Sequence, residues 1–178
     1  MTRLLRISAG TTLFVALVIT LLLPTESPAN DRMERRAQVS ALLKKSRGEL
    51  AAGQYQSALA SLLEAKGIDP NNQDAYYLTA VAHLALKDTL QARAVLTEGA
   101  EKAPLSSRIK LLLARVHLHS AEYDEAEQLL SAVFRFKPNN EEAMYLSGLV
   151  SLARGDTTRT LEVWQAALDR LQAKEPSR

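Results

Sequence analysis

Three prolines stand 34 residues apart, at Pro70, Pro104 and Pro138. The same spacing holds for other columns of the sequence. An alanine lies twelve positions before each proline, a small residue lies 24 positions before, and a large apolar residue lies eight positions before, and the last two columns continue for a fourth period. These columns are Ala58, Ala92, Ala126; Ser46, Ala80, Ala114, Gly148; and Leu62, Leu96, Leu130, Trp164. Self-similarity at such a period is typical of repeat architectures, so we expect the chain beyond residue 38 to fold as stacked units.

The pattern within one period is helical. Between residues 74 and 87, apolar groups recur three and four positions apart, which places them on one face of a helix and not on one face of a strand. Each proline fixes φ and biases the residue before it away from the α region, so it ends a helix. Each period is therefore predicted to be a pair of helices, and the fold class is all-α.

Composition agrees with this fold and excludes several classes of protein. The chain of 178 residues is 47% hydrophobic and 24% charged, as in ordinary globular proteins. With only 7 Gly and 6 Pro, it has few residues for the tight turns of many short strands. It has no Cys, which excludes disulfides and thiolate zinc sites, and its formal net charge of +2 predicts no nucleic-acid partner.

The repeated columns resemble the tetratricopeptide repeat (TPR) family. The closest match runs from Ser46 through Gly53, Tyr55 and Ala58 to Pro70, and residues 121–126 match nearly as well. The resemblance implies an α-solenoid of about four helix-turn-helix repeats that follows an N-terminal hydrophobic helix. The units are residues 39–72, 73–106, 107–140 and 141–174, with a linker or helix extension at 30–38 and a tail at 175–178.

Residues 1–29 read as a membrane-targeting segment. Arg3 and Arg6 precede an apolar stretch over residues 7–23, and Pro24 follows it. The triplet at residues 27–29 fits a signal peptide cleaved before Asn30, whereas the 17 residues from 7 to 23 reach the lower limit for an uncleaved membrane anchor. Both alternatives place the rest of the chain outside the cytoplasm, in the periplasm.

The resemblance also implies that the first helix of each unit lines an inner groove. The groove residues expected from it alternate between apolar, aromatic and arginine side chains, a mixture suited to binding a peptide or protein segment. The expected groove residues are Leu43, Arg47, Tyr77, Val81, Arg108, Leu111, Arg115 and Tyr145. An alternative interpretation is that Leu43 and Leu111 only pack between repeats.

Signatures of catalysis are missing from the sequence. The chain contains no Gly-rich phosphate loop, no Gly-x-Ser-x-Gly and no His-Glu-x-x-His motif. His83 and His117 share one column of the repeat and are interpreted as packing residues, while His117 and His119 point away from one another on a helix. We therefore expect no enzyme activity, no cofactor and no metal site. The Lys and Asn clamp of chaperone-binding family members is also absent, since only Arg108 is compatible with it.

The last helix presents an apolar row without a capping helix after it. Its members follow helical spacing at Leu161, Trp164, Leu168 and Leu171. This row is predicted to be an edge for docking or self-association, because repeat arrays normally shield such a face. The alternative for Trp164 is that it fills the gap that leucine fills in earlier units.

Together these features predict a non-enzymatic scaffold for protein–protein interactions. Exported relatives of this kind commonly assist the assembly of cell-envelope complexes, and the expected partner is a peptide or protein held in the groove. Membrane contact through residues 1–29, if they are retained, and homo-oligomerisation are further expectations. The alternative function is a self-assembling structural spacer that uses its exposed end helix.

Overall fold

The computed structural model describes residues 28–174, and the side chains of Pro28, Leu171, Ala173 and Lys174 are outside this description. The chain divides into two compact units, Met1–Ala37 and Gln38–Arg178. Within the described part of the first unit, residues 29–37 are helical and largely exposed, and Arg35 holds Asp31 through two hydrogen bonds of 2.9 and 3.0 Å. The predicted targeting segment at residues 1–29 falls almost entirely outside the described residues.

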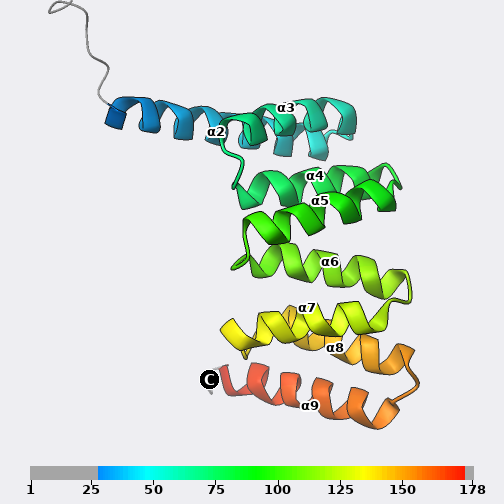
Figure 1. Ribbon diagram of the computed structural model, residues 1–178. Coiled ribbons are helices and arrows are strands. Elements are labelled where there is room, and N and C mark those ends of the chain that lie inside the picture. Colours follow the sequence, from blue (N-terminus) through cyan, green and yellow to red (C-terminus); the bar gives the residue numbers. More distant parts are fainter. Residues whose placement is uncertain (1–27, 175–178) are drawn as a thin grey trace, which may run out of the picture. The chain divides into compact units, whose positions relative to one another are not determined.

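The described residues form helices and no strands, which confirms the all-α prediction (Figure 1). Among these helices, none is both long enough and apolar enough to cross a membrane. The helices are α2 (Pro28–Ala51), α3 (Tyr55–Ile68), α4 (Gln73–Ala85), α5 (Thr89–Lys102), α6 (Ser107–His119), α7 (Tyr123–Phe136), α8 (Glu141–Ala153) and α9 (Thr157–Lys174).

The phased prolines end three helices in the same way. The residues before them, Asp69, Ala103 and Lys137, are the C-caps of α3, α5 and α7 and have φ between −137° and −128°. Asn72 and Asn140 then start the next helices, since each accepts a hydrogen bond from the N–H three residues on, at 3.1 and 2.8 Å. The prediction that each proline closes a helix pair is thus confirmed.

The turns inside the helix pairs share a left-handed residue. Gly53, Lys87, Ala121 and Gly155 have φ of 74°, 62°, 59° and 82°, and they are spaced by one period. A positive φ is unstrained for glycine and costs an L-residue about 1–2 kcal/mol. The fold therefore imposes one turn geometry on all four pairs, although only two of the four residues are suited to it.

Small and large residues in the repeated columns build the core. Ala58, Ala92 and Ala126 are fully buried, and the leucines four positions after them are no more than 1% exposed. Burying a leucine contributes about 1.5–3 kcal/mol, so this column alone is a major part of the stability. Three successive clusters of buried residues form along the second unit in place of one closed core.

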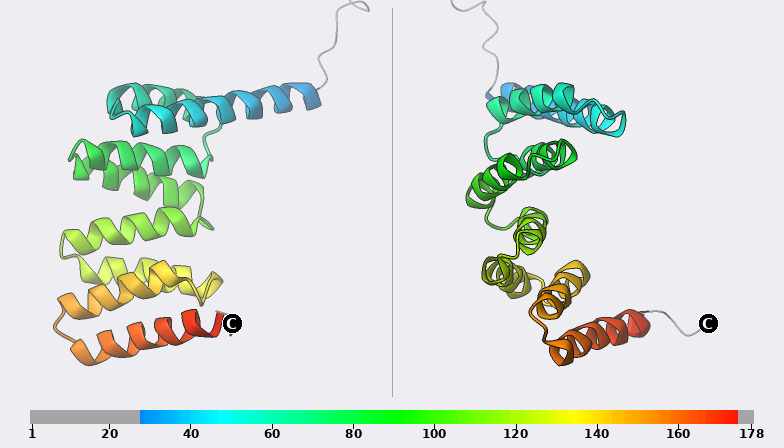
Figure 2. Two further views of the ribbon diagram at one scale, coloured as in Figure 1. Left: turned by 180° about the vertical axis from the view of Figure 1, so that it is seen from behind. Right: turned by 90° about the vertical axis from the view of Figure 1, so that its right-hand side faces the viewer.

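The first helices of the pairs make a continuous wall. In the second unit, α4 contacts α6 and α6 contacts α8, in addition to the contacts inside pairs and between consecutive helices. Seen end-on, α6 and α8 lie on one side and α7 on the other (Figure 2). Because neighbouring first helices touch each other, they form the inner side of the stack, where the sequence places the groove.

The last helix pair differs from the two before it at one contact between its helices, where a smaller residue faces a larger one. Where the earlier pairs have Ala80 with Leu96 and Ala114 with Leu130, the last pair has Gly148 with Trp164. A Cβ atom on Gly148 would lie 1.9 Å from the Trp164 indole nitrogen, so the indole occupies the space of the missing methyl group. The indole N–H also donates to the Tyr145 carbonyl at 3.3 Å.

Candidate functional site

The candidate site is the inner wall, formed by α4, α6, α8 and the part of α2 beyond residue 37. Five of its positions on α2 and α4 have a chemically similar counterpart 68 residues later on α6 and α8, which is a period of two units. These pairs of residues are Leu43 and Leu111, Arg47 and Arg115, Asp74 and Glu142, Tyr77 and Tyr145, and Val81 and Leu149. The wall therefore presents two similar halves.

Ion pairs join consecutive helices of the wall. Arg47 contacts Asp74 at 2.7 Å, and in the other half Arg115 contacts Glu142 at 2.5 Å. The arginine side chains in these pairs are 50% and 55% exposed, so each pair contributes at most about 1 kcal/mol to stability. Their main effect is to hold planar cationic groups at fixed points on the wall.

Arg108 completes the first half of the wall. Its guanidinium contacts the second carboxylate oxygen of Asp74 at 3.2 Å, and its Cζ lies 3.7 Å from the centroid of the Tyr77 ring. One carboxylate thus holds two arginines from two different helices, and an aromatic ring lies under one of them.

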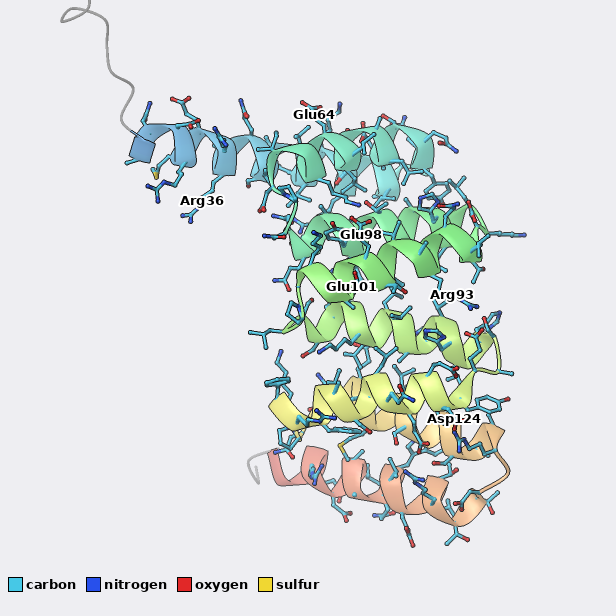
Figure 3. The ribbon with its side chains drawn as sticks, viewed as in Figure 1. Arg36, Glu64, Arg93, Glu98, Glu101 and Asp124 are labelled. Carbon is cyan, nitrogen blue, oxygen red and sulfur yellow. The ribbon has the colours of Figure 1, made fainter. Side chains whose placement is uncertain are left out.

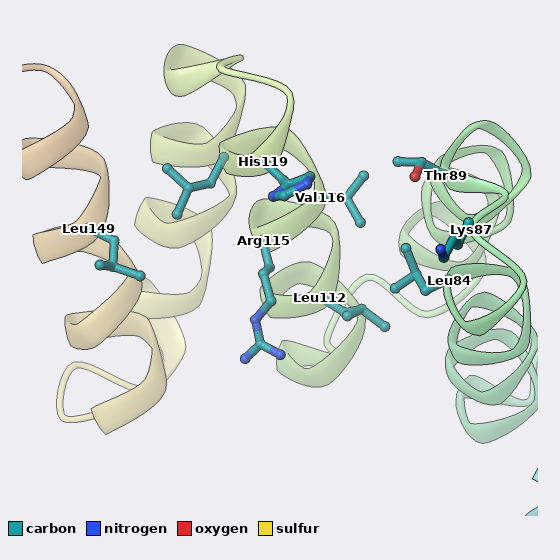
Figure 4. A pocket seen from close by; sticks show the side chains of 9 residues that line it. Leu84, Lys87, Thr89, Leu112, Arg115, Val116, His119 and Leu149 are labelled. Carbon is teal, nitrogen blue, oxygen red and sulfur yellow. The ribbon is translucent and has the colours of Figure 1, made fainter.

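A pocket of about 710 Å³ opens on the wall between the end of α4, α6 and α8 (Figure 4). Arg115 and His119 extend from α6 between Leu149 on one side and Leu84 with Lys87 on the other. Most of the lining is apolar, and the charged lining groups are cationic. The lining residues are Leu84, Lys87, Thr89, Leu112, Arg115, Val116, Leu118, His119 and Leu149.

A second hollow of about 670 Å³ lies at the turns that contain the prolines. Arg108 and Asp74 reach it from the wall, and Lys102, Pro104 and Lys137 belong to its rim. The wall and this hollow are therefore contiguous through the ion pair of Arg108 with Asp74.

The structure places the eight expected groove residues in two groups. Arg47, Arg108, Arg115 and Tyr145 are exposed on the wall, and Tyr77 and Val81 are half-buried there. Leu43 and Leu111 are 7% and 4% exposed and belong to core clusters, as the packing alternative expected. They offer a ligand almost no surface.

Most of the residues that line the pocket were not predicted from the sequence. Of the eight expected groove residues, only Arg115 lines it. Leu112, Val116 and His119 follow one another at helical spacing on α6, and that spacing was the available signal. It did not distinguish a pocket lining from a core row, because the pocket depends on how α4 and α8 lie beside α6.

The carboxylates with shifted pKa values lie in contacts between helices. Glu98 lies on α5 (Figure 3). It accepts a hydrogen bond from the Tyr76 hydroxyl at 2.7 Å, which lowers the pKa of the carboxyl. Burial and this same hydrogen bond raise the pKa of Tyr76 to about 12. A hydrogen bond with His117 lowers the pKa of Glu122, which also pairs with Arg93 at 2.7 Å. These clusters connect neighbouring helices of the stack.

The residues of the predicted docking edge on α9 also differ in exposure. Leu161 and Leu168 are 69% and 47% exposed, whereas Trp164 is half-buried against Gly148. The side chain of Leu171 is outside the described residues. Within residues 28–174, no three His, Asp or Glu side chains come together in a way that could hold a metal ion.

Solved structures with a similar fold include several repeat proteins. The chain is 23% identical to a structure from the functional characterization of Pseudomonas aeruginosa pilF, with a TM-score of 0.70 over 80% of this chain and 65% of that one. It is 18% identical to YrrB, described as a TPR protein with an unusual peptide-binding site, with a TM-score of 0.62 over 74% and 68%. It is 19% identical to the first TPR of Spaghetti (RPAP3) bound to an HSP90 peptide, with a TM-score of 0.61 over 67% and 94%.

A family model gives the assignment that these fold similarities alone do not. No curated protein sequence matches the chain. The model of the tetratricopeptide repeat matches residues 49–110 and 83–149, which together span more than half of the 178 residues. With the phased prolines at equivalent corners and the paired helices between them, this match shows that the chain belongs to the tetratricopeptide repeat family.

Proposed function

We propose that this chain is a scaffold for protein–protein interactions that binds a peptide or protein segment on its inner wall. The observation that carries the proposal is the pocket of about 710 Å³ between α4, α6 and α8. An apolar hollow with cationic groups around it suits a large apolar side chain of an extended segment. Two proteins of similar fold are described as having a peptide-binding site or a bound peptide.

The proposed place of action is outside the cytoplasm, where the scaffold assists the assembly of a cell-envelope complex. The support for export is the sequence of residues 1–29, in which Arg3 and Arg6 precede the apolar stretch. Fusing residues 1–29 to a reporter enzyme that is active only outside the cytoplasm tests it. An active fusion is expected, and an inactive one whose apolar stretch is intact would contradict export.

Site-specific photo-crosslinking tests the inner wall. A photoreactive residue is introduced in the full chain at Arg115 or Tyr145, and in control variants at Leu63 or Leu90, which are exposed on α3 and α5. We expect discrete adducts in cells from the wall positions only. Adducts of equal yield from the control positions would contradict binding on the wall.

The alternative function, a self-assembling spacer, is favoured by the exposure of Leu161 and Leu168 on α9. Light scattering on the full chain measures its mass as a function of concentration. A spacer would form larger species, and replacing both leucines by Gln would abolish them. A constant monomer mass would exclude this function.

A further inference from the structure

The two halves of the inner wall are alike in sequence, but they differ in whether an arginine lies over the tyrosine ring. In the first half, Arg108 lies over the ring of Tyr77 at 3.7 Å and contacts Asp74 at 3.2 Å. Arg108 comes from the next first helix, α6. The first half therefore shows what kind of group an acid and a tyrosine at these positions hold.

The second half has a glutamate and a tyrosine at the matching positions, and within residues 28–174 no cation lies over the ring of Tyr145. Glu142 and Tyr145 lie 68 residues after Asp74 and Tyr77, and Glu142 pairs with Arg115 just as Asp74 pairs with Arg47. The position that corresponds to Arg108 is residue 176, which is a proline. Tyr145 is 55% exposed although its ring stacks with that of Trp164 at an interplanar angle of 15°, whereas Tyr77 is half-buried.

We infer that Glu142 and Tyr145 form a binding site for an arginine side chain of a partner protein, which takes the position that Arg108 has in the first half. This inference deepens the proposed function, because the site lies on the same wall. The partner's guanidinium contacts the Glu142 carboxylate and lies over the Tyr145 ring.

Arginine fits this site better than lysine. A planar guanidinium lies flat on an aromatic ring while its edge donates hydrogen bonds to a carboxylate, whereas an ammonium group is a compact charge that favours water. Arg108 makes both contacts at once in the first half. One carboxylate can serve two guanidinium groups, as Asp74 does for Arg47 and Arg108.

The direct test is a titration of the full chain with a short blocked peptide that contains one arginine among glycines. The comparison peptide carries citrulline, which has nearly the same shape without the charge. Trp164, the only tryptophan, lies 6.2 Å from Tyr145 between ring centroids, so its indole N–H signal in NMR spectra reports occupancy. We expect the arginine peptide to bind about tenfold more tightly than the citrulline peptide.

Variants assign the binding to these two residues. Glu142→Gln is expected to weaken arginine binding about fivefold, and Tyr145→Leu about threefold. Glu162→Gln, an exposed change on α9, is the matched control and should leave binding unchanged. Arg108→Ala empties the equivalent position in the first half, so calorimetry should then find two arginine sites per chain in place of one.

Three results would overturn the inference. They are equal binding of the citrulline peptide, unchanged binding after Glu142→Gln, and binding that appears only when Arg178, in the chain's own tail, is changed to Gln. Each of them leaves the proposed function intact if photo-crosslinks still form at Arg115. If those crosslinks are lost while the arginine titration succeeds, the proposed function fails and the arginine site stands.

Discussion

The second helix pair, α4 with α5, and the last pair, α8 with α9, share one column pattern but differ in what surrounds them. The second pair contacts helices on both sides, α3 and α6, whereas among the described residues the last pair contacts only the preceding helices. Tyr77 is half-buried in the former, and its counterpart Tyr145 is 55% exposed in the latter. Exposure in this fold is therefore decided by the neighbouring unit more than by the residue's own helix.

The two pairs also differ in which atoms lie against the glycine where their helices approach closely. In the second pair, Gly99 lies against Tyr76, and a Cβ at that glycine would lie 2.8 Å from the Tyr76 Cβ. In the last pair, Gly148 lies against the indole of Trp164. The first contact involves an atom fixed to the backbone, and the second involves the end of a side chain. A second substitution at the neighbouring residue should therefore restore the lost stability at Gly148 but not at Gly99.

The largest effect is expected for Gly148→Ala. Because the new Cβ would lie 1.9 Å from the Trp164 indole nitrogen, the indole must leave its position. Overpacking of this kind costs about 2–3 kcal/mol in the free energy of unfolding, measured by urea denaturation. The double variant Gly148→Ala with Trp164→Leu recreates the Ala and Leu combination of the earlier pairs and should recover most of the loss.

A matched control is Gly48→Ala on α2, where a Cβ would meet no atom within 4 Å. This change should stabilise the chain slightly, because alanine has a higher helix propensity. If the double variant is no more stable than Gly148→Ala alone, the proposed complementarity of the last pair is wrong.

Gly99→Ala should cost about 1–2 kcal/mol, and here no replacement of the neighbour helps. The contact is with the Tyr76 Cβ, an atom present in every residue except glycine, and the new Cβ would also lie 3.2 Å from Ile109 Cδ1. Tyr76→Leu combined with Gly99→Ala should therefore be less stable than either single variant. Recovery in a thermal unfolding experiment would contradict the contrast drawn between the two pairs.

Substitutions at the left-handed turn residues should change stability by smaller amounts, with opposite signs in neighbouring units. Lys87→Gly and Ala121→Gly should each stabilise the chain by about 0.5–1 kcal/mol, since both residues have positive φ. Gly53→Ala and Gly155→Ala should destabilise it by about 1 kcal/mol for the same reason. Urea denaturation of the four variants measures both signs, and a loss of stability in Lys87→Gly would contradict the strain assigned to the turn.

The smallest effect concerns pH and distinguishes the two pairs again. The pKa of Tyr76 is raised from 10.0 to about 12, so its contribution to stability is complete below pH 10 and is lost as the pH rises through 12. The last pair has Met144 in this column and contributes no such loss. Tyr76→Phe should therefore reduce the decline in unfolding free energy between about pH 10 and about pH 12.

The lowered pKa of Glu98 has the opposite sign, because its contribution is present at neutral pH and is lost as the pH falls below 4.5. An identical alkaline decline in Tyr76→Phe and in the unchanged chain would show that the Tyr76 hydroxyl adds nothing to the pH dependence.

Much of the fold was predictable because the repeated residues include prolines, which act strongly on the local backbone conformation. A proline ends a helix wherever it stands, so Pro70, Pro104 and Pro138 predicted the corners. The complementary pair Gly148 and Trp164 was also visible in the aligned columns. The left-handed turn was only half visible, since Lys87 and Ala121 carry no sign of a positive φ in their side chains.

The site was less predictable because it depends on distances between helices. Leu43 and Leu111 share columns with Tyr77 and Tyr145, yet the leucines are buried and Tyr145 is exposed. The pocket beside α6 involves residues from four helices and the α4–α5 turn, and no spacing along the chain reports how far apart these lie. The arginine site required knowing which ring Arg108 covers.

The two-unit period of the inner wall limits how such a chain can lengthen during evolution. Adding one copy of a 34-residue segment between α5 and α6 would keep every proline in phase but would place two like first helices side by side. The acid of one would then face an acid, or an arginine an arginine, in place of the present ion pair between Arg108 on α6 and Asp74 on α4. Growth by duplication of 68 residues avoids this conflict, so descendants with six units are expected to be more readily tolerated than descendants with five.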